Sequence, residues 1–119
     1  MINKKHRSQR MEGELQKVLA EIVREELKDP RLELITFTDV KVARDLSFAK
    51  IFVSHLKEDR LSEALLVLNK AKGLIRKQIG MKMQLRIVPE IAFFPDDSLS
   101  YSQRINEILK EIKDEGKKD

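Results

Sequence analysis

The sequence predicts an α+β domain in which a three-stranded sheet is covered by helices on one face. Three observations predict this class. A chain of 119 residues, 41% of them hydrophobic, is the size of one domain with one core. Some segments place apolar residues at helical spacing, and others are rich in β-branched and aromatic residues. The segments follow the order helix, strand, strand, helix, helix, strand, helix, without an internal repeat or a long linker.

The first helix is predicted over roughly residues 8–28. Its apolar residues share one face: Met11, Leu15, Val18, Leu19, Ile22 and Leu27. Ser8 is the predicted N-cap, because its hydroxyl can accept from the first free N–H groups of a helix. The segment "DPRL" ends the helix, since a residue that precedes proline disfavours the α conformation.

Two strands, "ITFTDVKVA" and "LSFAKIFVS", are predicted to form a hairpin around "RDL". In the first strand, Ile35 and Phe37 have the opposite parity to Val40 and Val42. A β-bulge near 38–39 would bring all four side chains to one face. The sequence therefore predicts an irregular first strand.

The second strand alternates Ala49, Ile51 and Val53 with a face that carries Lys50. Phe48 and Phe52 lie on the Lys50 face, where they could stack on nucleobases if the helices cover the other face. The preferred interpretation at this point is that these two rings belong to the core.

A helix is predicted over "KEDRLSEALLVLNKAKG", with a shorter helix after Gly73. The segment "LRIVPEIAFF" is predicted as a strand, and Pro89 within it requires an edge position or a bulge. A C-terminal helix from about 99 to 114 is marked by Ile105, Ile108, Leu109 and Ile112. We expect a domain at 1–96, with a basic N-terminal arm, and a C-terminal helix and tail at 97–119.

Several classes of function are disfavoured by missing motifs. The chain has four glycines and no cysteine, and it contains neither a P-loop nor a dinucleotide-binding fingerprint. His6 and His55 stand alone, and "PDDS" is typical of a helix entry. No apolar run approaches the roughly 18–20 residues of a membrane span, and no apolar region follows the basic start. We expect a cytoplasmic, non-catalytic protein without a metal, a cofactor or a small-molecule substrate.

The net charge of +4 is unevenly distributed along the chain. Residues 1–10 and 70–88 carry basic residues without any acidic one, whereas residues 11–35 are net acidic. Such segregation favours a surface that binds a polyanion, and the alternative is two solvated patches. The candidate phosphate-binding residues are Lys70, Lys72, Arg76, Lys77, Lys82 and Arg86, with Lys4, Lys5, Arg7 and Arg10 as an arm.

Gly73 interrupts a helical pattern inside the basic segment, although an interior glycine costs a helix about 1 kcal/mol relative to alanine. A helical wheel places Ile75, Ile79 and Met83 on one face and Gly73, Lys77, Gly80 and Gln84 on the other. We interpret Gly73 as a kink with positive φ, where a second helix starts and its free N–H groups bind phosphate. The alternative is a tolerated defect in one long helix.

A helix, a glycine break and a helix between strands form the centre of the KH RNA-binding fold, whose loop is G-x-x-G. Here the junction is Ala71-Lys72-Gly73, one residue shorter and without the first glycine. The chain resembles the ribosome-binding factor A family over nearly its whole length. The similar segments are "KKHRSQRMEGEL", "KDPRL", "FTDVKVARDLSFAKIFVS", "KAKGLIRKQIG" and "LRIVPEIAFFPDDSLSYSQRI".

The resemblance implies a type II KH-like domain that acts as a monomer. It also implies binding to the immature 30S ribosomal subunit and its 16S rRNA, support of late rRNA processing, a link to cold adaptation, and no catalysis. Gly73 would allow close approach of the RNA, and the Lys and Arg side chains would neutralise phosphates. Two alternatives remain: a generic single-strand KH module, which would be expected to carry G-x-x-G, and a basic protein-interaction module.

Overall fold

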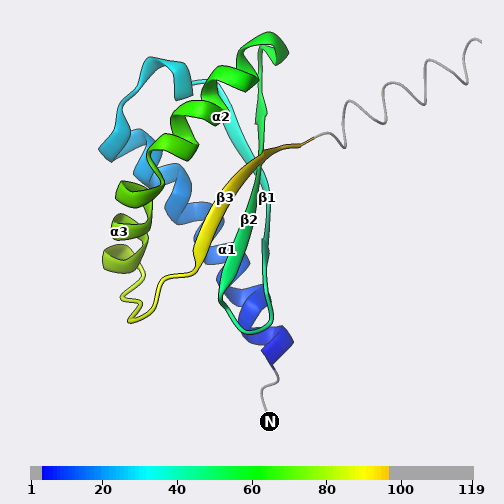
Figure 1. Ribbon diagram of the computed structural model, residues 1–119, viewed down its shortest axis with the longest axis vertical. Helices are drawn as coiled ribbons and strands as arrows, with labels where there is room; N and C mark the ends of the chain where they lie inside the picture. The colour runs from blue at the N-terminus through cyan, green and yellow to red at the C-terminus, as the bar shows by residue number, and fades with distance from the viewer. Residues whose placement is uncertain (1–3, 97–119) are drawn as a thin grey trace, which may run out of the picture.

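The computed structural model describes residues 4–96, with side chains from Arg7 onward. Helices α1 (Lys4–Ile22), α2 (Leu61–Lys70) and α3 (Lys72–Lys82) lie on one side of a sheet (Figure 1). The sheet has the order β1-β2-β3, with β1 (Ile35–Val42) antiparallel to β2 (Phe48–His55) and β3 (Glu90–Pro95) parallel to β2. The predicted α+β class and helix-covered sheet are confirmed; the predicted C-terminal helix lies outside the described residues.

Helix α1 begins earlier than the sequence predicted. It starts at Lys4, so Ser8 lies inside the helix and is buried, and the predicted N-cap is wrong. The reason is spacing, because Ser8 lies seven residues before Leu15 on the stripe that faces the core. A small polar residue thus takes a buried helical position instead of a cap.

The predicted end of this helix is confirmed. One π-helical turn, η1 (Val23–Leu27), continues α1, and Lys28 then adopts a left-handed conformation with φ 47°. A short 3₁₀ turn, η2 (Pro30–Leu32), follows, and the carboxylate of Asp29 accepts from the N–H of Arg31 at its start. The turn returns the chain toward β1 and buries Leu32 in the core.

The Asp29 cap should make stability depend on acid. Two side-chain hydrogen bonds from Arg31 (3.0 and 2.7 Å) and one from its backbone N–H lower the pKa of Asp29 to about 2, against an ordinary value of 3.8. Because the pKa of Asp29 is lower in the folded protein than in the unfolded chain, its ionised carboxylate stabilises the fold at pH values above 3.8. This contribution is lost as the pH falls toward 2. We expect Asp29→Asn to lower Tm near neutral pH and the difference from wild type to shrink between pH 4 and 2. A pH-independent difference in melting scans would contradict this.

The hairpin has the predicted irregularity. Ile35 pairs with His55 and Val42 with Ala49, and the register shifts between Phe37 and Asp39. This bulge brings the apolar residues of both halves of β1 to the helix-covered face, where Phe37, Val40 and Val42 are buried. The core combines them with Ala49, Ile51 and Val53 of β2, which are fully buried.

Phe48 and Phe52 are not core residues, so the preferred interpretation of this pair is wrong. The helices take the opposite face of the sheet, and both rings are half-buried on the open face. Phe52 contacts Phe94 of the neighbouring β3, with ring centroids 6.1 Å apart. Phe94 is 38% exposed. An aromatic pair therefore lies on the face of the sheet opposite α1, α2 and α3.

The third strand is shorter than predicted. It begins at Glu90, and Pro89 lies buried just before it. Of the two predicted alternatives, an edge position or a bulge, the described sheet shows the edge position, because β3 follows β2 at the end of the strand order. Across the described residues, no helix is long and apolar enough to cross a membrane.

Candidate nucleic-acid interface

The junction between α2 and α3 is one residue long. Ala71 (φ −90°, ψ 8°) separates the two helices, and its N–H donates to the carbonyl oxygens of Val67 and Leu68, both at 3.1 Å. The next turn closes when the N–H of Ile75 donates to the Ala71 carbonyl oxygen at 2.9 Å. The N–H groups of residues 72–74 therefore form the first turn of α3, where a helix has no acceptors of its own. This end carries the positive end of the helix dipole.

Gly73 does not form the kink that the sequence suggested. No described glycine has a positive φ, and Gly73 lies in the first turn of α3. The break falls two residues earlier, at Ala71, whose conformation any L-residue can adopt. A Cβ added to Gly73 would meet nothing within 4 Å, and the residue is exposed. The backbone conformation at position 73 therefore does not require glycine. The missing side chain leaves the helix backbone open to a ligand.

Gly73→Ala should therefore raise stability by up to about 1 kcal/mol, because alanine loses less conformational entropy in a helix. Urea unfolding monitored by circular dichroism measures the change. A loss of stability would show that Gly73 needs a conformation closed to alanine. A matched Gly13→Ala variant is a control, since Gly13 also lies in a helix and faces open space.

Arg76 is partly buried against the chain that leads into β3. Its guanidinium donates to the carbonyl oxygens of Val88 (2.9 Å) and Pro89 (3.1 Å) and lies 3.5 Å from the carboxylate of Glu90. Arg76 follows the buried Ile75 by one position, and the segment before β3 passes along this side of α3. These contacts give Arg76 a structural role, and its role as a phosphate ligand stays a prediction.

Lys82 is also engaged within the protein. Its ammonium lies 3.4 Å from a carboxylate oxygen of Glu25 and 4.0 Å from one of Glu21, so it joins α3 to α1 and η1. The predicted placement of Gly80 on the outer face of α3 is wrong. A Cβ at Gly80 would lie 3.0 Å from a methyl group of Val88, so this glycine packs against the returning chain and not on the outer face.

The other basic residues of segment 70–88 are candidates for phosphate contact. Ile75 and Ile79 are buried as predicted, which leaves Lys77 exposed on the other side of α3. In the described part of the chain, no ion pair involves the following residues: Lys70, Lys72, Lys77 and Arg86. Lys70 and Lys72 flank the junction at Ala71, and Lys77 follows one turn after Gly73. We call Lys70, Lys72, Gly73 and Lys77 the junction surface.

The basic N-terminal arm is part of a helix. Lys4 and Lys5 begin α1, with side chains outside the described set, and Arg7 and Arg10 are exposed further along it. Figure 1 places the start of α1 beside the β1–β2 turn, well apart from the α2–α3 junction. The fold therefore separates the two basic groups.

Sequence reasoning missed the acidic residues that pair with Arg76 and Lys82 within the protein. Glu90 lies 14 positions after Arg76, and Glu25 lies 57 positions before Lys82. Only the tertiary packing of β3 and α1 against α3 brings these charges together. Counting charges within residues 70–88, which suggested six phosphate ligands, cannot detect such pairs.

Comparison with known proteins identifies similar chains. The sequence profile of the family described as ribosome-binding factor A matches residues 7–109. Ribosome-binding factor A of Desulforamulus reducens is 44% identical over 108 residues, which cover 90% of either chain. The solution structure of a Thermotoga maritima ribosome binding factor A is 35% identical with a TM-score of 0.69, covering 82% of this chain and 94% of that one. A Thermus thermophilus ribosome binding factor A, a homology model fitted into an electron-microscopy map of a 30S complex, is 28% identical with a TM-score of 0.64 and 74% and 93% coverage.

Proposed function

The chain belongs to the ribosome-binding factor A family, and on this basis we propose that it binds the immature 30S ribosomal subunit through 16S rRNA. The proposed role is non-catalytic, carried out by a monomer in the cytoplasm, and it supports late maturation of that rRNA. The 30S complex of the Thermus thermophilus protein supports the choice of partner. The junction surface is the proposed contact, because it combines free cations with a helix N-terminus.

The proposed contact acts mainly on the phosphate backbone. Lys70, Lys72 and Lys77 supply point charges, and Gly73 leaves the backbone of α3 open to close approach. Groups able to read base edges are scarce on this surface, so weak sequence preference and strong salt dependence are expected. Arg86, Arg7 and Arg10 are proposed as secondary contacts, since each is exposed.

A second candidate function is the binding of single-stranded RNA on the open face of the sheet. One observation favours it: Phe52 and Phe94 form a partly exposed ring pair, and the exposed Lys50 precedes Phe52 by two positions on the same face. Base stacking on exposed rings is the usual mode of single-strand recognition on a sheet. The short Ala71-Lys72-Gly73 junction disfavours a standard KH clamp on four nucleotides.

Co-sedimentation with immature and mature 30S particles at two salt concentrations tests the proposed function. We expect more protein in the immature-particle pellet and a steep loss of binding as the salt concentration rises. Equal binding to both particles would remove the role in maturation. Binding to unstructured oligonucleotides without binding to particles would favour the single-strand module.

The segment 97–119 is proposed as an appendage to the domain. It follows a unit of three helices and three strands, and its five basic and six acidic residues give it no excess of positive charge with which to bind phosphate. We expect truncation after Asp97 to leave a folded domain, with Tm close to the wild-type value, and to reduce association with 30S particles. Global unfolding in a circular-dichroism scan would instead place this segment in the core.

A further inference from the structure

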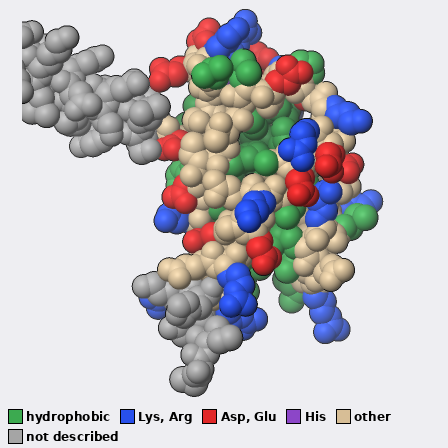
Figure 2. All heavy atoms as spheres, turned by 180° about the vertical axis from the view of Figure 1, so that it is seen from behind, with side chains coloured by type: hydrophobic (Ala, Val, Ile, Leu, Met, Phe, Trp, Pro, Cys, Tyr) green, Lys and Arg blue, Asp and Glu red, His purple; other side chains and the backbone are tan. Residues whose placement is uncertain are grey.

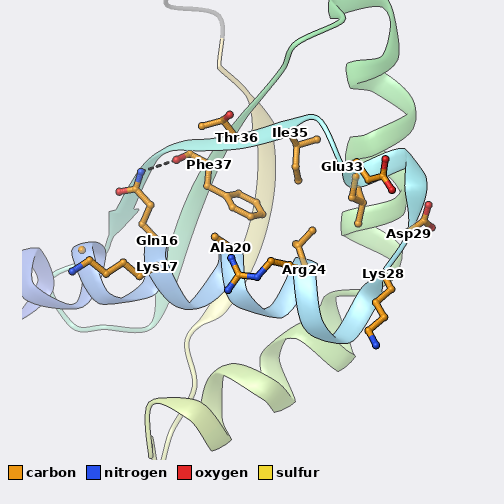
Figure 3. Close-up of a pocket in the computed structure, with 13 residues that line it drawn as sticks. Gln16, Lys17, Ala20, Arg24, Lys28, Asp29, Glu33, Ile35, Thr36 and Phe37 are labelled. Atoms are coloured by element: carbon orange, nitrogen blue, oxygen red, sulfur yellow. Dashed lines mark hydrogen bonds between the residues drawn. The ribbon is translucent and has the colours of Figure 1, made fainter.

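A groove of about 910 Å³ lies between α1 and the edge strand β1. Figure 2 shows apolar side chains exposed in the middle of this side of the molecule, with charged side chains around them. In Figure 3, one wall is lined by Lys17 and Ala20 of α1 and Arg24 of η1, and the other by Ile35 and Phe37 of β1. No residue of the junction surface lines this groove, so it is separate from the proposed RNA contact.

The charges of α1 and η1 are sorted between two directions. The acidic residues Glu21 and Glu25 point toward α3, where they meet Lys82. Glu25 also lies 3.7 Å from the guanidinium of Arg24. Three basic residues line the groove instead: Lys17, Arg24 and Lys28. Asp29 and Glu33 lie at its far end, where the Asp29 carboxylate is already bound by Arg31. The helix wall is therefore basic, although this part of the sequence is net acidic.

The strand wall presents peptide groups that point away from the sheet. The N–H of Leu56 donates to the carbonyl oxygen of Leu34 across the hairpin. Peptide groups alternate in direction along an antiparallel strand, so those of Ile35 and Phe37 point outward. The amide of Gln16 confirms this direction, because it donates to the Phe37 carbonyl oxygen at 2.6 Å (Figure 3).

Side chains block the rest of this edge but leave its first part open. The N–H of Val42 donates to the carboxylate of Glu12 at 2.8 Å. The N–H of Val40 donates to the carboxylate of Asp39 at 2.9 Å. In the described part of the chain, no side chain bonds to the peptide groups of Ile35 or to the N–H of Phe37. An open edge of this kind is a template for another strand.

We propose that the groove binds an extended, acidic segment of a partner protein, which adds to β1 as a further strand. The outward N–H and carbonyl of Ile35 and the N–H of Phe37 match a peptide backbone, which offers both an acceptor and a donor. Phosphate groups could use only the donors. The apolar side chains that line the groove accept alternate side chains of the partner segment. The basic residues of the groove favour acidic side chains in that segment.

The spacing of the charges fits such a segment. Lys17 lies on α1 and Arg24 on the η1 turn that continues it, and the seven positions that separate them span about 10.5 Å at the α-helical rise. Two acidic residues four positions apart on an extended chain are about 13 Å apart and point to the same side. The long, flexible lysine and arginine side chains span the difference of about 2.5 Å.

Binding of a designed peptide tests the proposal. The probe is a fluorescein-labelled nine-residue peptide, Thr-Glu-Thr-Val-Thr-Glu-Thr-Val-Thr, and its control replaces both glutamates by lysine. Fluorescence anisotropy with the full-length protein should detect saturable binding of the acidic peptide and at least tenfold weaker binding of the basic one. The pair Lys17→Glu and Arg24→Glu should weaken acidic-peptide binding at least tenfold. The matched pair Lys57→Glu and Arg60→Glu, exposed and outside the groove, should not.

Amide hydrogen exchange followed by NMR identifies the binding mode. The Ile35 and Phe37 amides should exchange quickly in the free protein and slow at least fivefold with saturating acidic peptide. Absence of binding at 1 mM peptide, or binding without this protection, overturns the proposal. Protection that appears without peptide as the protein self-associates in sedimentation would identify a second copy as the occupant. Protection by an oligonucleotide alone would identify RNA, and either result also overturns the proposal.

Discussion

Replacing Lys70, Lys72 and Lys77 together by glutamate should weaken binding to immature 30S particles by on the order of 100-fold or more. These residues surround the N-terminus of α3, and no ion pair within the described residues engages any of them. The fold should be retained, because the buried side of α3 is formed by Ile75 and Ile79. Filter binding or co-sedimentation at fixed salt measures the loss.

The control is a second triple reversal, of Lys17, Arg24 and Lys28, which changes the net charge by the same amount on the groove side of α1. It should retain most of the binding, since long-range attraction alone is screened at physiological salt. The slope of log K against log salt should become shallower by about three for the junction triple, one for each lost phosphate contact. Equal losses from both triples would mean that only net charge matters.

Arg76→Ala should lower the free energy of unfolding by about 2 kcal/mol, because it leaves two partly buried carbonyl oxygens without their charged donor. Arg76 binds both Val88 and Pro89, and so fixes the start of β3 against α3. Arg76→Lys should recover only part of the loss, since an ammonium lacks the planar fork of donors. The neighbouring Lys77→Ala should change stability by no more than about 0.5 kcal/mol.

Urea unfolding of these variants separates structural from RNA-binding roles within one basic segment. The predicted pattern is a large loss of stability for Arg76 and a large loss of particle binding for Lys77. If Arg76→Ala kept full stability but reduced 30S binding, its hydrogen bonds to the β3 entry would contribute little, and Arg76 would return to the set of phosphate ligands.

Local pattern was enough to predict most of the fold. The parity change between Phe37 and Val40 required the bulge that the sheet contains, and the proline after Asp29 ended the first helix as expected. The helical wheel identified Ile75 and Ile79 as the buried face of α3. Each of these features depends on residues close in sequence, whose spacing carries the information.

The errors arose where distant segments meet. The acidic partners of Arg76 and Lys82 come from β3, α1 and η1, so these ion pairs could not be read from the basic segment itself. Gly80 was assigned to an open face that the segment before β3 covers. The side of the sheet that the helices cover decides whether Phe52 lies in the core or on the surface. Alternation within one strand separates its two faces but does not show which face the helices cover.

Gly73 illustrates a different limit. Sequence shows that a helix is interrupted in the basic segment, but not which residue absorbs the turn. Ala71 does so with a conformation open to any residue, and the helix resumes at Lys72. The functional interpretation survives in changed form, because the first turn of α3 still presents free N–H groups beside lysines.

Tethered hydroxyl-radical cleavage of 16S rRNA tests the junction surface most directly. The chain has no cysteine, so a single Leu74→Cys substitution, at a side chain 45% exposed beside Gly73, gives a unique attachment point for iron-EDTA without removing a lysine. Ala20→Cys, in the groove between α1 and β1, is the matched control. In complexes with immature 30S particles, we predict strong localised cleavage of 16S rRNA from position 74 and weak or no cleavage from position 20. Strong cleavage from position 20 with none from position 74 would contradict the assignment of the α2–α3 junction as the rRNA contact.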